Sequence, residues 1–111
     1  MSEASLTGQA TESIKFASIS LAASGEVVAA VTGKKIRVLG YVLVAAGAVS
    51  VNWEDGTTNI SGVSSLITGT PVSYAGGWDA PAVETSASAA LQLTLSGAVQ
   101  VSGHVTYIEV D

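Results

Sequence analysis

The stretch Lys34–Asp55 reads Lys-Lys-Ile-Arg-Val-Leu-Gly-Tyr-Val-Leu-Val-Ala-Ala-Gly-Ala-Val-Ser-Val-Asn-Trp-Glu-Asp, and it decides the predicted fold. Its short runs of β-branched and apolar residues predict two β-strands joined at Ala46-Gly47. In the first strand, the face expected to point into the core carries Ile36, Val38, Val42 and Val44. The opposite face begins with two cations and continues as Leu39, Tyr41 and Leu43. A strand that is apolar on both faces must be covered on both, by its own domain or by another subunit.

Short strands separated by turn residues are predicted over the rest of the chain. The first of them places Ile14 and Phe16 on one face and Lys15 and Ala17 on the other, with one side buried. Asp55-Gly56 is typical of a tight hairpin turn. Further strands are predicted at 26–31, 57–61, 72–74, 91–95 and 99–107. Seven or eight short strands with regularly spaced turns predict an all-β, antiparallel sandwich or barrel.

Length and charge restrict the possible functions. A chain of 111 residues is expected to form one domain, which we place at 12–111 after a flexible polar arm at 1–11. The net charge of −5 argues against nucleic acid as a partner, because a phosphate backbone requires basic surface. Only 12% of the residues are charged while 48% are hydrophobic, so we expect the protein to oligomerise and cover part of its surface.

Neither a membrane span nor a secretory signal is predicted. The longest solidly apolar run, 38–53, is too short for a spanning helix and is rich in β-branched residues. The longer uncharged run at 85–108 alternates polar with apolar residues, which is typical of strands. The first residues lack a basic start followed by an apolar stretch. We therefore expect no membrane partner.

The sequence contains no group of residues typical of an enzyme. Cys is absent and His104 is the single His, so neither a thiol nucleophile nor a Ser-His-Asp arrangement is indicated. Glu54 and Asp55 are adjacent carboxylates, but neighbours on a strand point to opposite faces. Gly33-Lys34-Lys35 lacks the other residues of a phosphate-binding loop. We therefore predict no catalytic residue, no metal site and no cofactor.

A glycine-rich loop contains two aromatic residues that could contact a ligand. Trp78 follows Gly76-Gly77, and Tyr74 lies four residues before Trp78. Aromatic side chains on loops commonly stack against sugar rings, so one interpretation is a glycan-binding loop. The interpretation that we favour is that Trp78 closes the end of the sandwich or seals a subunit contact, because only 5% of the chain is aromatic.

Three segments of the chain resemble small structural proteins of tailed bacteriophages. They are Val-Thr-Gly-Lys-Lys-Ile-Arg-Val-Leu-Gly-Tyr-Val-Leu-Val-Ala-Ala-Gly at 31–47, the loop around Gly76-Gly77-Trp78, and Ala-Val-Gln-Val-Ser-Gly-His-Val-Thr-Tyr-Ile-Glu-Val at 98–110. Proteins of this kind resemble the jelly-roll capsid decoration, or cement, proteins, which sit as trimers on the outside of a head shell and brace it. The resemblance implies a jelly-roll sandwich, a homotrimer and an N-terminal arm that reaches over the capsid.

These features together predict a virion structural protein on the outer capsid surface, made in the host cytoplasm. Its expected partners are two further copies of itself and the shell of the major capsid protein. The expected subunit contacts are Leu39, Tyr41 and Leu43. The expected shell contacts, in the arm and in a basic spot on the first strand, are Ser2, Glu3, Leu6, Lys34, Lys35 and Arg37. The alternative is a tail or fibre adhesin that binds host glycan through Tyr74 and Trp78.

Overall fold

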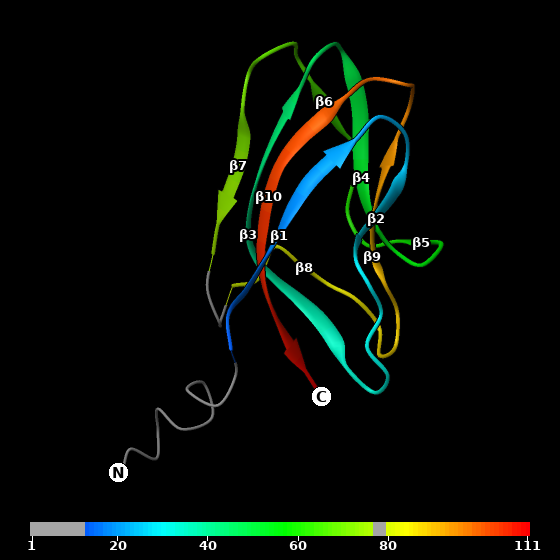
Figure 1. Ribbon diagram of the computed structural model, residues 1–111, viewed down its shortest axis with the longest axis vertical. Helices are drawn as coiled ribbons and strands as arrows, with labels where there is room; N and C mark the ends of the chain where they lie inside the picture. Colours follow the sequence, from blue (N-terminus) through cyan, green and yellow to red (C-terminus); the bar gives the residue numbers. More distant parts are fainter. Residues whose placement is uncertain (1–12, 77–79) are drawn as a thin grey trace.

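The computed structural model of the chain describes residues 13–76 and 80–111, and Figure 1 shows two β-sheets that pack face to face. The regular structure of these residues is entirely β-strand, and all pairings between the strands are antiparallel. The predicted all-β antiparallel sandwich is therefore confirmed. The strands are β1 (Lys15–Leu21), β2 (Gly25–Val28), β3 (Lys35–Ala45), β4 (Val49–Asp55), β5 (Thr58–Asn59), β6 (Ser64–Leu66), β7 (Val72–Ala75), β8 (Val83–Glu84), β9 (Leu91–Leu95) and β10 (Val101–Val110).

The strand order makes this sandwich a jelly roll. Sheet A has the order β1-β10-β3-β7, with β8 also paired to β3, and sheet B has the order β2-β9-β4-β5, with β6 also paired to β4. The pairs are nested along the chain: β1 with β10, β2 with β9, β3 with β7 and β8, and β4 with β5 and β6. Successive pairs alternate between the two sheets, as in one long antiparallel ribbon that is rolled up. The predicted jelly-roll type is confirmed by this order.

A β-bulge interrupts the pairing of the two longest strands, β3 and β10. Val38 lies opposite Tyr107 and Gly40 lies opposite Thr106, so Leu39 is an extra residue with no partner in β10. Side chains alternate along a strand with a period of two. One extra residue therefore moves every later side chain of β3 to the opposite face.

The bulge exchanges the buried and outer faces of β3. Before it, Ile36 points into the core and is fully buried, as predicted. After it, Leu43 and Ala45 belong to the buried core, while Val42 and Val44 lie on the other face and are only half-buried. The prediction that Val42 and Val44 face the interior is therefore wrong, because strict alternation was assumed across the bulge.

Strand β1 turns its largest apolar residue outward. Ile19 is 3% exposed and belongs to the core, and Ala17 and Leu21 pack against the core from the same face. Phe16 is 74% exposed, and Ile14, just before the strand, is 52% exposed. The apolar pair Ile14 and Phe16 therefore lies on the open side of this strand.

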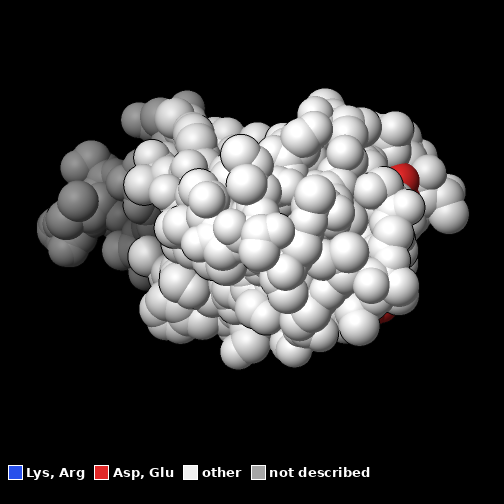
Figure 2. Space-filling view, turned by 90° about the horizontal axis from the view of Figure 1, so that it is seen from above, with Lys and Arg blue, Asp and Glu red and all other residues white. Residues whose placement is uncertain are grey.

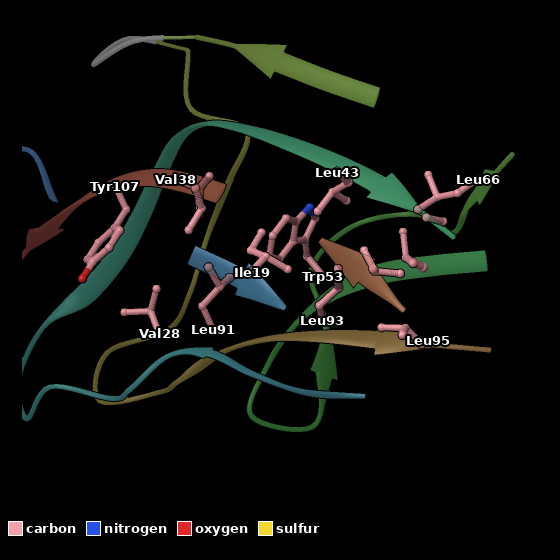
Figure 3. Packing of buried hydrophobic residues seen from close by; sticks show 14 of the residues in the cluster. Ile19, Val28, Val38, Leu43, Trp53, Leu66, Leu91, Leu93, Leu95 and Tyr107 are labelled. Atoms are coloured by element: carbon pink, nitrogen blue, oxygen red, sulfur yellow. The ribbon is translucent and has the colours of Figure 1, made fainter. Parts of the chain in front are cut away.

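The core fills the space between the two sheets with large apolar side chains from both, as Figure 3 shows around Trp53. Each such side chain contributes about 1.5–3 kcal/mol when it is removed from water. Burial, with the charge of Glu109 as a second cause, raises the pKa of Tyr107, so this phenol stays neutral in the core. The fully buried large residues are Ile36, Leu43, Leu91, Leu93, Ile108, Val38, Val101 and Val105.

The predicted turn and several predicted strands are present, while the strands predicted at 26–31 and 57–61 are shorter, as β2 and β5, and β6 and β8 were not predicted. β4 ends at Asp55, Gly56 has a φ of 64°, and β5 begins at Thr58, so the predicted hairpin turn is confirmed. The strands predicted at 72–74, 91–95 and 99–107 correspond to β7, β9 and β10. The predicted arm at 1–11 lies outside the residues that the structure describes.

Candidate functional site

The outer face of sheet A is the surface best suited to contact another protein. Cross-strand pairing arranges it in three rows: Phe16-Thr106-Gly40-Ala75, Ser18-His104-Val42-Ser73 and Ser20-Ser102-Val44. None of these positions carries Asp, Glu, Lys or Arg. Depletion of charged residues is typical of the buried centre of a protein interface. These rows of the sheet therefore have the composition of a contact surface.

Exposed apolar side chains concentrate at the β1 side of this face. Phe16 stands on the edge strand of sheet A with 74% of its surface exposed. A shallow depression on the same face is lined by Ile14, Leu39, Val42 and His104, among others. A contiguous exposed apolar patch on a soluble protein usually marks a contact with another molecule.

The outer face of sheet B is polar by contrast. Glu26, Gln92 and Glu54 lie side by side in one of its rows. Asn52 is 9% exposed, and its Nδ2 donates a hydrogen bond of 2.9 Å to Asn59 Oδ1. Glu26 is exposed, Glu54 and Gln92 are half-buried, and the buried Asn52 amide is paired within the chain, so this face needs no apolar cover and is suited to face water.

The two ends of the sandwich also differ in charge. One end is formed by the loops at 22–24, 46–48, 67–71 and 96–100, none of which contains a charged residue. Figure 2 looks onto this end, which is white apart from red points at its margin. The opposite end carries the ion pairs between Lys34, Lys35, Arg37, Glu84 and Asp111.

The predicted basic spot is a cluster of ion pairs within the chain. Arg37 Nε donates to Glu84 Oε1 at 2.7 Å, and Lys35 Nζ lies 4.0 Å from Glu84 Oε2. Lys34 Nζ donates to Asp111 Oδ1, and this hydrogen bond and the lysine charge hold the pKa of the Asp111 carboxyl below its usual range. The three cations therefore present less net positive charge to a partner than their sequence suggests.

The three residues predicted as the subunit contact do not share a face. Leu43 is 2% exposed and lies in the core, so its assignment to a subunit contact is wrong. Tyr41 packs against the core, with its ring edge-to-face on Trp53 at a centroid distance of 5.3 Å. Leu39 is buried outside the core cluster and lines the depression on the outer face of sheet A. The bulge at Leu39 causes this separation.

The sequence reasoning missed Phe16, Val42 and Val44 as the apolar side chains of the outer face. One signal for the change of face was present in the sequence. Gly40 interrupts an otherwise β-branched and aromatic strand, and an isolated glycine in a strand often marks a bulge or a close backbone approach. A Cβ at Gly40 would lie 2.9 Å from the Tyr74 carbonyl oxygen, so the position also allows β7 to approach β3.

The predicted glycan-binding residues are described only in part. Tyr74 is 37% exposed, and its hydroxyl donates a hydrogen bond of 2.6 Å to the Ala80 carbonyl oxygen. Its ring stacks against Tyr41 at a centroid distance of 6.3 Å, which covers one side of the ring. Trp78 lies outside the described residues, as do the predicted shell contacts Ser2, Glu3 and Leu6.

The titratable residues considered for chemistry are dispersed. His104 is exposed on the outer face of sheet A. Asp55 is 8% exposed, and its Oδ2 accepts hydrogen bonds from the backbone N–H and the hydroxyl of Ser86, at 2.9 and 2.8 Å. Glu54, its neighbour, is half-buried and is contacted by Asn52 at 3.5 Å. Within 13–76 and 80–111, no three His, Cys, Asp or Glu side chains form a group that could hold a metal ion.

The pair of hydrogen bonds to Asp55 is expected to stabilise the fold. Replacing Asp55 by Ala removes the charged acceptor that ties the segment before β9 to the end of β4, and should lower the free energy of unfolding by about 1.5–3 kcal/mol. Glu54→Ala is the matched control and should change it by less than about 0.5 kcal/mol. Urea unfolding of both variants measures the difference, and equal effects would contradict the structural role of Asp55.

Comparison with known proteins gives no assignment. No family model matches the chain. No curated protein and no solved structure matches it either. No helix in the described part of the chain is long and apolar enough to cross a membrane. The indication of function comes from the geometry itself: a jelly roll with one polar face, a second face that contains three uncharged rows, and exposed aromatic surface on the latter.

Proposed function

We propose that this protein is a virion structural protein, a capsid decoration protein that assembles as a homotrimer and braces the outer head shell. The observation that carries the proposal is the part of the outer face of sheet A formed by the three rows above, which contains no charged side chain and exposes 74% of Phe16. A structural subunit needs a face that is covered in the assembly, and this face has the composition for it.

The energetics favour assembly through this face. Burial of a Phe side chain contributes about 1.5–3 kcal/mol, and a closed trimer makes the same contact three times. The half-buried Val42 and Val44 extend the apolar area across β3. The three rows of this face contain no carboxylate, and Glu84, farther along the face, is already paired with Arg37, so burial of the rows does not incur the cost of burying an unpaired charge.

Two further features support the capsid assignment. Jelly rolls occur in viral capsid and lectin domains, so the confirmed strand order is compatible with both candidate functions. The resemblance to small structural proteins of tailed phages favours the first. In our proposal the arm and the charged end with Lys34, Lys35 and Arg37 contact the shell of the major capsid protein.

Self-association should depend on Phe16. At micromolar concentration, light scattering of the wild-type protein should give three times the chain mass of 11.0 kDa. Phe16→Ser should shift the mass to that of a single chain, because the largest apolar contact is lost while the buried core is unchanged.

A matched control separates this effect from general loss of apolar surface. Ile67 is 68% exposed in the loop between β6 and β7, away from sheet A's outer face, so Ile67→Ser should leave the mass unchanged. A wild-type protein that scatters as a single chain would contradict the trimer. Attachment to empty head shells, followed by sedimentation of the mixture, then tests the capsid assignment.

The second candidate function is a tail or fibre adhesin. The observation in its favour is the partial exposure of Tyr74, close to the loop that carries Trp78 in the sequence. A glycan array that compares the wild type with Trp78→Ala distinguishes the two functions. Binding that is lost in the variant supports the adhesin.

A further inference from the structure

A cavity opens into the sandwich between the free edges of the two sheets. It has a volume of about 210 Å³ and lies between β3, β7 and β8 on one side and β4 and β6 on the other. Its lining combines apolar side chains, the aromatic rings of Tyr41 and Trp53, and the polar residues Asn52, Ser61 and Ser64. The apolar side chains include Leu43, Val51, Leu66 and Val72. None of the lining residues carries a charge. The cavity is separate from the outer face of sheet A proposed for assembly.

The cavity wall contains a buried hydrogen-bond donor without an acceptor. Trp53 is 4% exposed, and its backbone is fully paired: its N–H donates to Ser61 Oγ at 2.8 Å and its carbonyl accepts from Ile60. In contrast, the indole Nε1 has no hydrogen-bond acceptor among residues 13–76 and 80–111. Figure 3 shows the indole nitrogen on the edge of the ring toward Leu43, which also lines the cavity. A buried indole N–H normally finds a partner, because an unpaired donor is costly.

The size and chemistry of the cavity define the ligand that fits. An apolar cavity of about 150 Å³ is large enough to bind benzene, so the volume of about 210 Å³ here, with its mixed lining, has room for a single ring with a small polar substituent. Burial of an ionised group without a charged partner is strongly unfavourable, which excludes charged ligands. We propose that the cavity binds a small uncharged cyclic molecule whose carbonyl or hydroxyl oxygen accepts a hydrogen bond from Trp53 Nε1.

Cyclohexanone and methylenecyclohexane are suitable probes, because they have the same shape and only the first has an acceptor oxygen. Nitrogen-15-labelled protein with Trp78→Phe has a single indole N–H signal, that of Trp53. Titration with cyclohexanone should move this signal saturably, with a Kd on the order of millimolar for so small a ligand. Methyl signals of Leu43, Val51 and Leu66 should report the binding of both probes.

The hydrogen bond is tested by comparing the two probes in a second variant. Trp53→Phe should weaken cyclohexanone binding by about tenfold more than it weakens methylenecyclohexane binding, because only the ketone loses a partner. Equal weakening of the two probes would overturn the role of Nε1. The absence of a saturable shift with cyclohexanone at about fifty times the expected Kd would overturn the site.

A filled-cavity variant keeps the test decisive if Trp53→Phe does not fold. Ala82 lines the cavity, and Ala82→Phe should abolish binding of both probes while the spectrum stays dispersed. Unchanged binding in this variant would overturn the assignment of the ligand to this cavity. A change in the light-scattering mass of Ala82→Phe would instead indicate that a neighbouring subunit occupies the cavity, which also overturns the proposal.

Discussion

Replacing Gly103 by Ala is expected to lower the free energy of unfolding by about 3 kcal/mol or more, enough to leave much of the protein unfolded. Gly103 lies in β10 opposite Leu43 of β3, at the centre of sheet A. Its φ is 152°, and a Cβ there would lie 1.8 Å from the Val42 carbonyl oxygen and 2.8 Å from the carbonyl carbon. The obstacle is backbone, so no side-chain rotation can relieve it.

The loss should come from separation of β3 and β10. These strands form the long central pair of sheet A, with β1 on one side and β7 on the other, so a local shift disturbs both neighbours. Urea unfolding followed by tryptophan fluorescence measures the change. Gly97→Ala is the control, because Gly97 has no heavy atom within 4 Å of an added Cβ. A stability of Gly103→Ala close to that of Gly97→Ala would contradict the close approach of the two strands.

The second large effect distinguishes two adjacent positions on β3. Leu43→Ala is expected to cost about 2–5 kcal/mol, because the Leu43 side chain is 2% exposed and its removal enlarges a cavity in the core. Val44→Ala should cost less than about 1 kcal/mol, because Val44 lies half-buried on the outer face of sheet A. Strict alternation from Ile36 predicts the opposite order of the two effects.

This comparison should be made where assembly cannot contribute to stability. Val44 belongs to the face proposed for subunit contact, and association stabilises a folded protein by mass action. Unfolding of both variants in the Phe16→Ser background removes that contribution. A larger loss in Val44→Ala than in Leu43→Ala would show that the bulge at Leu39 does not exchange the faces.

Much of the local structure could be predicted because its causes are local. Asp55-Gly56 specifies a tight turn through the positive φ that Gly56 adopts, and Leu91, Leu93 and Leu95 mark a half-buried strand by alternation alone. The outer face of sheet A could not be predicted in the same way. Phe16 has the apolar character of a core residue, and its exposure depends on which side of β1 meets β10 and sheet B.

The three residues of β3 predicted to face a neighbouring subunit are divided between the two faces of the strand. The prediction of a doubly covered strand correctly identified β3 as apolar on both faces, and Leu39 does line the outer depression. Leu43 was assigned outward because the count from Ile36 passed through Leu39 without a break. Leu39 can be recognised as the extra residue only from the pairing of β3 with β10. Val38 and Gly40 lie opposite two consecutive residues of β10, which leaves Leu39 without a partner.

The sequence by itself determined the all-β class, the places of the main strands, the Asp55-Gly56 turn and the shortage of charge that indicates a covered surface. The tertiary structure decided which side chains of β1 and β3 face outward, how the ion pairs of the basic spot form, and where Trp53 borders a cavity. The physical reason is that alternation and turn chemistry act within a few residues of the chain. The side of a strand that is buried depends instead on pairing between β3 and β10, which lie far apart in the sequence.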